Sequence, residues 1–262
     1  MPPKKPVLKS KPSPNTPRPN WPVFKPLLPS SDLALTTLLP SQIILIHEFF
    51  TQKLCSTYVK FLNTLPLVTT PGKPKRGDAL RFNDRYQVND ELFARRLWEA
   101  TGLRELVCGG EEEDGKGGGM TEEERRELWG GEVVGLNPSI RIYRYTQGQY
   151  FDCHYDETND LVLATKPSPT PVKTTWTLLL YLTSPTTGCQ GGETVFHPDE
   201  LPGKKNTVEK EIAVGLETGM ALLHKHGHDC LLHEGREVTE GEKWVIRSDL
   251  CVRKEKSKGV FT

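Results

Sequence analysis

Short apolar or alternating runs, separated by turn residues, make up the second half of the chain. From residue 139 onward, eight such runs follow one another, with glycines or prolines between them. Alternation of apolar and polar positions is typical of a half-buried strand, and a short wholly apolar run is typical of a buried one. The predicted strands are residues 140–145, 150–155, 174–183, 194–197, 211–214, 221–225, 230–233 and 243–252. Eight short strands without helices between them favour a β-sandwich or a jelly roll.

The first half of the chain adds helices to this pattern. Residues 43–46 and 80–88 are predicted strands, and each is followed by a helical spacing of apolar residues. Thr51 is predicted to cap the first helix and Asn89 the second, because both side chains can accept a hydrogen bond from a free backbone N–H. The apolar faces contain Leu54, Tyr58 and Leu62 in the first helix and Leu92, Phe93, Leu97 and Trp98 in the second. The expected fold class is therefore α+β, with an N-terminal helical flank against a double-sheet C-terminal half.

Charge is unevenly distributed along the 262 residues, although 34 basic and 34 acidic residues balance overall. Residues 1–30 hold six bases, no acid and ten of the 21 prolines, which leaves a net charge of −6 for the rest. We therefore expect a Pro/Lys-rich disordered tail at 1–30 and a single domain at 31–262. The Gly-rich stretch 109–127 is acidic, and we expect a solvated surface loop there that passes into a short helix at Thr121–Trp129.

Several classes of protein are disfavoured by what the sequence lacks. The longest apolar runs are much shorter than the roughly 20 residues of a membrane-spanning helix. The basic start is not followed by the apolar region of a secretory signal. The six cysteines contain no C-x-x-C pair, and we interpret them as reduced thiols of a cytoplasmic or nuclear protein. The acidic globular part also disfavours a nucleic-acid partner, whose phosphates call for a basic surface.

The pair His154 and Asp156 is the first candidate for metal chemistry. Residues i and i+2 of a strand point to the same face, so the imidazole and the carboxylate converge. Two histidines and one carboxylate form a facial triad that leaves coordination positions open for dioxygen and a bidentate co-substrate. A third ligand on a later strand would complete it. The candidates in that region are His197, His224, His226, His228 and His233.

Lys243 opens the last predicted strand and shares one face with Arg247 and Asp249. A lysine buried near a metal needs an anionic partner, because an unpaired buried charge is costly. A dicarboxylate supplies one, since it can chelate the metal at one end and meet the ammonium at the other. Taken alone, Lys243 is more simply interpreted as a surface lysine on an edge strand. Arg247 could assist it, although an ion pair between Arg247 and Asp249 is the preferred interpretation.

Five blocks in a fixed order resemble the iron(II)- and 2-oxoglutarate-dependent dioxygenases, specifically their prolyl 4-hydroxylase-like branch. These blocks are Tyr145–Asp156, Thr177–Leu182, Gly191–Phe196, Gly219–Leu223 and Leu232–Trp244. Together they span about residues 140–252. Five ordered blocks are more specific than any single one of them.

The resemblance implies a double-stranded β-helix, or jelly roll, with N-terminal supporting helices. It also implies iron(II), with 2-oxoglutarate and dioxygen as co-substrates and ascorbate as a further small-molecule partner. The implied catalytic metal ligands are His154, Asp156 and His233. The implied 2-oxoglutarate contacts are Lys243 for the distal carboxylate, together with Tyr145, Tyr181 and Thr194.

The implied reaction is hydroxylation of a peptidyl residue in a protein or peptide, with proline as the expected target. The alternatives are another residue, a small molecule or a nucleobase, and, from a different class, a non-catalytic binding module. Lys173 matches only approximately the basic residue that often precedes the strand of Tyr181 in prolyl enzymes. Residues 159–172 are expected to form a loop that could close over a substrate. We expect the histidines of His224–His228 to be structural rather than a separate zinc site.

Overall fold

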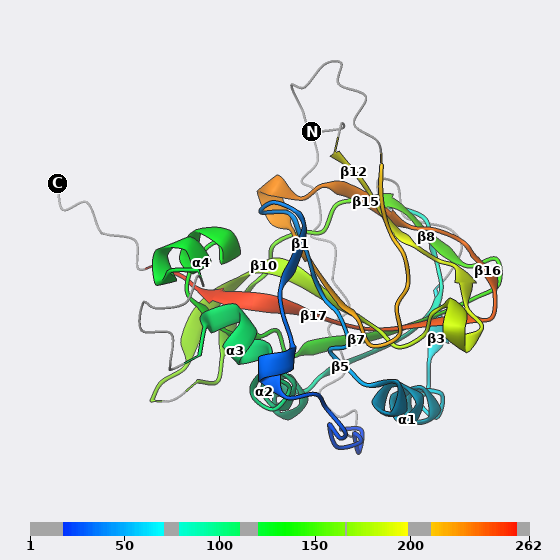
Figure 1. Ribbon diagram of the computed structural model, residues 1–262, viewed down its shortest axis with the longest axis horizontal. Helices are drawn as coiled ribbons and strands as arrows, with labels where there is room; N and C mark the ends of the chain where they lie inside the picture. The colour runs from blue at the N-terminus through cyan, green and yellow to red at the C-terminus, as the bar shows by residue number, and fades with distance from the viewer. Residues whose placement is uncertain (1–17, 71–78, 111–119, 166, 199–210, 256–262) are drawn as a thin grey trace, which may run out of the picture.

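A computed structural model describes residues 18–70, 79–110, 120–165, 167–198 and 211–255 of the chain. Within this part, a ten-stranded sheet faces a five-stranded sheet, and helices cover the outer side of the larger one (Figure 1). No helix in the described ranges is long and apolar enough to cross a membrane.

The strands of these ranges form a large, a small and a two-stranded sheet. The large sheet contains β1 (Thr36–Leu39), β2 (Ile43–Ile46), β3 (Val68–Thr69), β5 (Asp84–Asn89), β6 (Val133–Leu136), β7 (Ser139–Thr146), β9 (Asp160–Leu163), β10 (Thr170–Tyr181), β14 (Ala221–Lys225) and β17 (Glu242–Arg253). The small sheet contains β4 (Arg81–Phe82), β8 (Tyr150–His154), β12 (Thr194–His197), β13 (Ile212–Val214) and β15 (Leu232–Gly235). The two-stranded sheet pairs β11 (Gln190–Gly191) with β16 (Val238–Glu240). The α-helices are α1 (Gln52–Leu62), α2 (Glu91–Glu99), α3 (Leu103–Cys108) and α4 (Glu122–Trp129), and the 3-10 turns are η1 (Ser30–Asp32), η2 (Pro185–Thr187) and η4 (Gly227–Asp229).

The two facing sheets are connected in jelly-roll order. In the large sheet the neighbours are β14, β10, β17 and β7, and in the small sheet they are β13, β12, β15 and β8. Among these eight strands, the chain changes sheet at every step except from β12 to β13. Each predicted strand of the C-terminal half is present within a few residues of its expected ends. The predicted α+β class with a jelly-roll core is confirmed.

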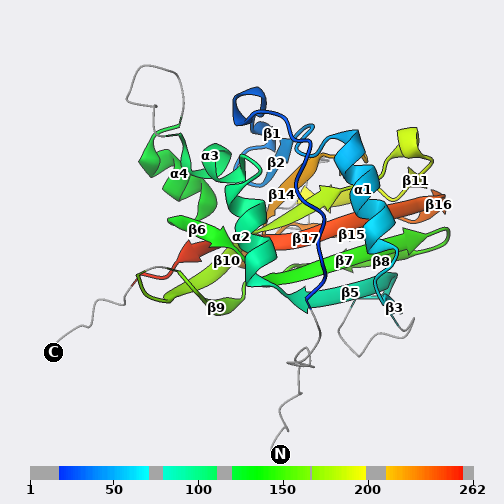
Figure 2. The ribbon, with the colours of Figure 1, turned by 90° about the horizontal axis from the view of Figure 1, so that it is seen from below.

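The helices lie across the outer face of the large sheet, where α1 and α2 cross β5, β7 and β17 (Figure 2). Helix α1 begins after Thr51, whose hydroxyl accepts from the N–H of Leu54 as predicted. Helix α2 is capped by Asp90 instead of Asn89, because the Asp90 carboxylate accepts from the N–H of Phe93. The buried face of α2 consists of Phe93, Ala94, Leu97 and Trp98. Leu92, which was predicted to belong to this face, is exposed.

Residues 80–88 were expected to form one strand, and the structure corrects this. Strand β4 belongs to the small sheet, whereas β5 belongs to the large one. The break falls at Asn83, which is buried between the two strands and whose carbonyl accepts from the N–H of Thr70. The chain therefore passes from one sheet to the other without a glycine or proline to mark the change.

The tail predicted at residues 1–30 is also corrected over residues 18–30, while residues 1–17 lie outside the described part. Trp21 and Phe24 are buried against the helices. The indole N–H of Trp21 donates to the carboxylate of Asp90 at 2.9 Å, and the Tyr58 hydroxyl donates to the carbonyl of Pro22 at 2.9 Å. Aromatic burial and these two bonds hold this Pro-rich segment on the domain.

Two other segments agree with their predictions in part. Helix α4 begins at a capping box in which Thr121 and Glu124 bond to each other's backbone, as the predicted helix requires. Residues 111–119 of the predicted acidic loop lie outside the described residues. Residues 159–172 are not a loop throughout: β9 and the start of β10 pair antiparallel, so much of the expected lid is an extension of the large sheet.

The large sheet buries apolar side chains on both faces. One core lies between this sheet and the helices and includes Trp244 and Ile246 of β17. A second core lies between the two sheets and includes Val245 of the same strand. Lys243 and Arg247 share the inner face with Val245, as the alternation predicts. Charged side chains thus enter the space between the sheets.

Candidate functional site

His154, Asp156 and His233 meet between the sheets at one end of the small sheet. His154 ends β8 and pairs directly with His233 of β15. Asp156 follows β8 by two residues. Its carboxylate oxygens lie 3.9 Å from Nε2 of His154 and 3.8 Å from Nε2 of His233. The structure therefore brings together the three residues that the resemblance implies as metal ligands.

Backbone carbonyls fix the orientation of both imidazoles. Nδ1 of His154 donates to the carbonyl of Asp152 at 2.8 Å, and Nδ1 of His233 donates to that of Leu231 at 2.9 Å. Because Nδ1 carries the proton in each ring, Nε2 keeps its lone pair and points it toward Asp156. The ring of Phe151 stacks on His154 with 3.5 Å between centroids, which holds that ring further.

Burial and charge set the protonation of these groups for metal binding. Burial lowers the pKa of His154 to about 3 and also lowers the pKa of His233, so both rings are neutral near pH 7. Burial, the largest single influence, raises the pKa of Asp156, but Arg247 together with the neighbouring histidines His233, His224 and His154 holds that pKa well below its usual range. Two neutral imidazoles and one carboxylate are a donor set that suits a divalent transition metal.

The separations also fit a single ion. Two nitrogen or oxygen donors that each lie about 2.1 Å from one metal can be at most about 4.2 Å apart. The two distances to Asp156, 3.8 and 3.9 Å, satisfy this limit, and the three donor atoms all lie within 4.8 Å of one another, so a small inward turn of the imidazoles brings the set onto one ion. The residues present therefore fit a metal bound by a facial triad.

Arg247 and Thr177 hold the Asp156 carboxylate in place. The Arg247 guanidinium donates to Oδ1 at 3.0 Å and lies 3.0 Å from Oδ2, and the Thr177 hydroxyl donates to Oδ2 at 2.9 Å. The expected partner of Arg247, Asp249, lies farther away at 3.5 Å. The preferred interpretation of Arg247 as a simple partner of Asp249 was thus incomplete, because its closest partner is Asp156, which follows a strand of the small sheet.

Lys243 lies buried on the central strand β17, so its interpretation as a surface lysine on an edge strand is wrong. Its ammonium donates to the carbonyl of Gly192 at 2.6 Å and lies 5.4 Å from the ring centroids of both Tyr145 and Tyr181. Among the described residues, no carboxylate lies within 4 Å of it. Burial lowers the pKa of Lys243 to about 8. A buried ammonium between two tyrosines is a seat for an anion.

The residues expected beside Lys243 are present around this seat. The hydroxyls of Tyr181 and Thr194 lie 2.7 Å apart, and both residues are buried. Tyr145 faces Lys243 across the β7–β17 pairing. The structure thus groups Lys243, Tyr145, Tyr181 and Thr194 in the same part of the interior.

The remaining candidate histidines differ in their surroundings. His226 is satisfied at both nitrogens, because Nδ1 donates to Thr177 and Nε2 accepts from Thr174, each at 2.9 Å. His228 is exposed, and His197 lies 3.4 Å from Glu234. His224 is buried with Nε2 3.6 Å from Asp156. The segment His224–His228 does not gather its histidines at one point, and only His224 of the three reaches the triad.

Lys173 does not reach the site. It lies in β10 beside a surface hollow that Arg126 of α4 and Arg253 also line, whereas the adjacent Thr174 contacts His226. The roles of Thr177, Arg247 and Gly192 were not predicted, because they arise from contacts between distant strands. The sequence indicated the role of Thr177 only by placing a threonine on the inner face of a strand that pairs with β17.

Comparison with known proteins identifies the segment that carries this site. Residues 140–248 match the family described as the 2OG-Fe(II) oxygenase superfamily. A probable prolyl 4-hydroxylase 4 from Arabidopsis thaliana is 34% identical over 121 residues, which cover 40% of this chain and 38% of that protein. Prolyl 4-hydroxylase 2 from the same plant is 34% identical over 122 residues, with the same coverage. The chain thus matches less than half the length of these relatives.

Among solved structures, a viral collagen prolyl hydroxylase from Paramecium Bursaria Chlorella virus-1, crystallised with 2OG, superposes with a TM-score of 0.49 at 16% identity. That match covers 80% of this chain and 96% of the viral one. The chain is thus similar, over less than half of its length, to the 2OG-Fe(II) oxygenase superfamily and to two plant prolyl 4-hydroxylases.

Proposed function

We propose that this chain is an iron(II)- and 2-oxoglutarate-dependent dioxygenase that hydroxylates a peptidyl residue, with proline as its target. One observation carries the proposal: the inner face of the jelly roll holds a metal-binding triad and, on the same face of β17 as Arg247, a buried ammonium without a carboxylate partner among the described residues. A metal site beside an anion seat is what chelation of a dicarboxylate requires.

His154, Asp156 and His233 would hold the iron. When bound, iron supplies the activation of dioxygen that accompanies oxidative decarboxylation of 2-oxoglutarate. The chain itself fixes the geometry: the carbonyls of Asp152 and Leu231 orient the two imidazoles. Arg247 keeps Asp156 ionised and limits its rotation.

Lys243 would bind the distal carboxylate of 2-oxoglutarate. The carbonyl of Gly192 already accepts one of its three N–H bonds, so two remain for the oxygens of an anion. Tyr181 and Thr194 form a hydroxyl pair beside it, and Tyr145 closes the other side. Burial excludes water and strengthens this charge-assisted bond.

The proposal of a peptidyl proline is supported by the 34% identity to two prolyl 4-hydroxylases over 121 and 122 residues. The residues after the N-terminal 30 carry a net charge of −6, which favours a neutral or basic segment around the target residue. Ascorbate, as a reductant that keeps the iron in the ferrous state, belongs to the same proposal.

The test is turnover with identified products. The purified full chain is incubated with iron(II), ascorbate, 2-oxoglutarate and a library of Pro-containing peptides, and succinate and peptide masses are measured. We expect succinate together with a +16 Da product whose added oxygen fragmentation places on proline. Oxygen found only on another residue, a small molecule or a nucleobase would contradict the proline target. Absence of succinate with every substrate would favour a non-catalytic binding module.

A further inference from the structure

The outer face of the small sheet carries a second group of metal-binding side chains. Residues of a strand alternate between the two faces, so the sequence neighbour of an inward-pointing residue points outward. His233 of β15 pairs with His154 of β8 and with Phe196 of β12, and the rings of these three residues pack together between the sheets. Each of the three has one sequence neighbour on the outer face, and these neighbours are Glu234, Cys153 and His197.

The three outward side chains converge on one point. The Cys153 sulfur, a ring nitrogen of His197 and a carboxylate oxygen of Glu234 all lie within 4.8 Å of one another. Nε2 of His197 lies 3.4 Å from Oε1 of Glu234. Two such donors, each about 2.1 Å from a tetrahedral zinc ion, are about 3.4 Å apart. This pair therefore already has the spacing of two zinc ligands, and a small turn of the exposed Cys153 side chain brings its sulfur to the same ion.

His197 has a buried ring nitrogen that the described residues leave without a hydrogen bond. Its Nε2 atom is shielded from solvent and has no hydrogen-bond partner among them, although Oε1 of Glu234 is only 3.4 Å away. A buried polar atom without a partner costs roughly 1–3 kcal/mol. A metal ion at the point where the three side chains converge would give this nitrogen its partner.

The Glu234 carboxylate is only weakly engaged by the cation beside it. Nε of Arg236 lies 4.0 Å from Oε1 of Glu234. The Arg236 guanidinium instead donates to both carboxylate oxygens of Glu211, at 2.8 and 2.7 Å. Because Glu211 balances most of that positive charge, Glu234 keeps a negative charge for a ligand that also contacts His197.

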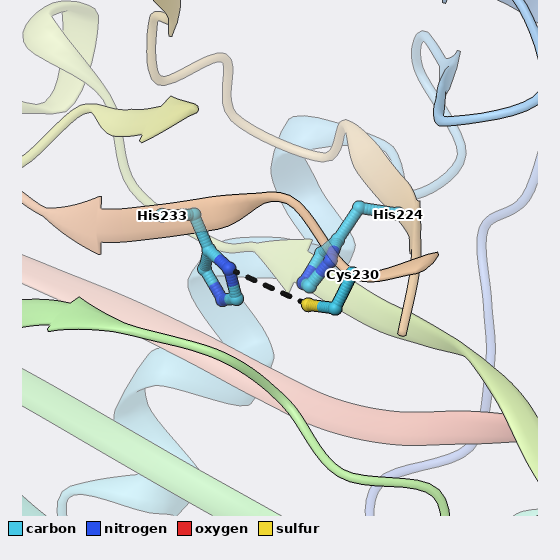
Figure 3. A group of neighbouring side chains, drawn as sticks. All are labelled: His224, Cys230 and His233. Carbon is cyan, nitrogen blue, oxygen red and sulfur yellow. Dashed lines mark hydrogen bonds between the residues drawn. The ribbon is translucent and has the colours of Figure 1, made fainter. Parts of the chain in front are cut away.

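A second possible group of donors, on the inner face, is already committed. His224, Cys230 and His233 lie within 4.8 Å of one another, and Figure 3 shows His224 and Cys230 side by side with His233 facing them. The Cys230 thiol accepts from the N–H of Asp156 at 3.3 Å and donates to the carbonyl of Leu231 at 3.4 Å. An additional ion there would break these bonds and compete for His233 of the proposed iron triad. The outer group does neither.

We propose that Cys153, His197 and Glu234 bind a zinc ion on the outer face of the small sheet. Thiolate, imidazole and carboxylate are the donors that zinc takes, and the soft thiolate selects zinc over the iron proposed for the inner face. The thiol proton passes to solvent when the metal binds. The ion would tie together β8, β12 and β15, two of which carry His154 and His233 on their other face.

The test uses Co(II) as a spectroscopic substitute for zinc in the reduced full chain. A thiolate bound to Co(II) gives an intense near-ultraviolet charge-transfer band, which a site of nitrogen and oxygen donors lacks. We expect this band in the wild type and its loss when Zn(II) is added. Cys153→Ser should abolish the band, whereas Cys108→Ser, which removes another exposed thiol, should retain it. His197→Ala and Glu234→Gln should each lower the Co(II) affinity read from the band at least about tenfold.

Two further variants assign the band to one site. Asp156→Ala disables the proposed iron triad and should keep the band, so the result does not depend on the proposed function. Cys230→Ser removes the inner thiol and should also keep the band. Circular dichroism verifies the fold of each variant, and Cys153→Ala replaces Cys153→Ser if serine perturbs it. A wild type without the band, a band that survives in the folded Cys153 variant, or one that is lost in folded Cys230→Ser would overturn the zinc site.

Discussion

At the scale of single residues, burial decides which groups carry charge between the sheets. Burial lowers the pKa of His154 to about 3 and that of Lys243 to about 8, so the imidazole is neutral while the ammonium remains charged near pH 7. The charge of Arg247 keeps Asp156 ionised despite its burial. The interior therefore holds the proposed metal ligands at one point and a buried cation at another.

Removing the cation should weaken binding of 2-oxoglutarate selectively. In Lys243→Ala we expect the KM for 2-oxoglutarate to rise by about 10- to 150-fold, because a hydrogen bond to a charged group contributes roughly 1.5–3 kcal/mol. Steady-state kinetics at saturating iron(II) measure it. Lys254→Ala, which removes a half-exposed lysine paired with Asp160, is the matched control and should leave KM unchanged. An unchanged KM in Lys243→Ala would mean that another residue binds the distal carboxylate, and Arg247 would be the next candidate.

The same lysine should make co-substrate binding depend on pH. Below about pH 8 Lys243 is an ammonium, and above it the free enzyme loses the proton that an anion needs. We expect the KM for 2-oxoglutarate to rise by up to about tenfold per pH unit above pH 8. Lys243→Arg stays charged at these pH values and should flatten the profile. Equal slopes in the wild type and in Lys243→Arg would assign the pH dependence to another group.

Arg247 should act on the metal through Asp156. Without its charge, the pKa of Asp156 rises because the effect of burial is opposed less strongly, and the carboxylate becomes protonated at a higher pH. In Arg247→Met we expect the pH at which Co(II) affinity falls to half its plateau to move upward. Arg253→Met, which removes an exposed arginine paired with Glu132, is the control. Superimposable pH profiles for the two variants would show that Arg247 does not position the ligand.

At the scale of elements, the N-cap of α2 lies one residue after the position that the sequence predicts. Asn89 and Asp90 are adjacent, and either type of side chain can cap a helix. Only the structure shows that Asn89 still belongs to β5, while Asp90 binds the N–H of Phe93 and the indole of Trp21. The cap of α2 and the anchor of the N-terminal segment are thus the same carboxylate.

Loss of that carboxylate should destabilise the domain. We expect Asp90→Ala to lower the free energy of unfolding by about 1–2 kcal/mol from the cap alone, with a further loss from the Trp21 bond. Asn89→Ala should change it by less than about 0.5 kcal/mol, since its side chain is exposed. Urea unfolding followed by circular dichroism measures both. An equal effect of the two substitutions would contradict the assigned cap.

At the scale of the whole molecule, the sequence predicts the jelly roll well because each strand carries its own alternation and its own turn residues. The prediction is wrong where an element depends on contacts with residues far away in the sequence. The pattern of residues 80–88 continues through Asn83, although the chain changes sheet there. Trp21 and Phe24 lie in a Pro-rich segment without periodicity, and only the helices that they contact reveal their burial.

The site shows the same division. The spacing of His154 and Asp156 and the family blocks predict three residues whose side chains the structure brings together. His224, His226 and His228 alternate identically in sequence, yet one faces the triad, one bonds to two threonines and one is exposed. Their roles differ because a bend at η4 ends the strand after Lys225, and the neighbours that follow come from distant parts of the chain.

The central claim is that His154, Asp156 and His233 hold an iron that turns over 2-oxoglutarate. The most direct test measures iron-dependent formation of succinate from 2-oxoglutarate under ¹⁸O₂, with the peptide library present. In the wild type and in His228→Ala we expect one ¹⁸O atom in each succinate, because dioxygen supplies an oxygen to that product. His154→Ala, Asp156→Ala and His233→Ala should form none while keeping their circular dichroism spectra. Labelled succinate at wild-type rates from any of these three folded variants would contradict the assigned ligands.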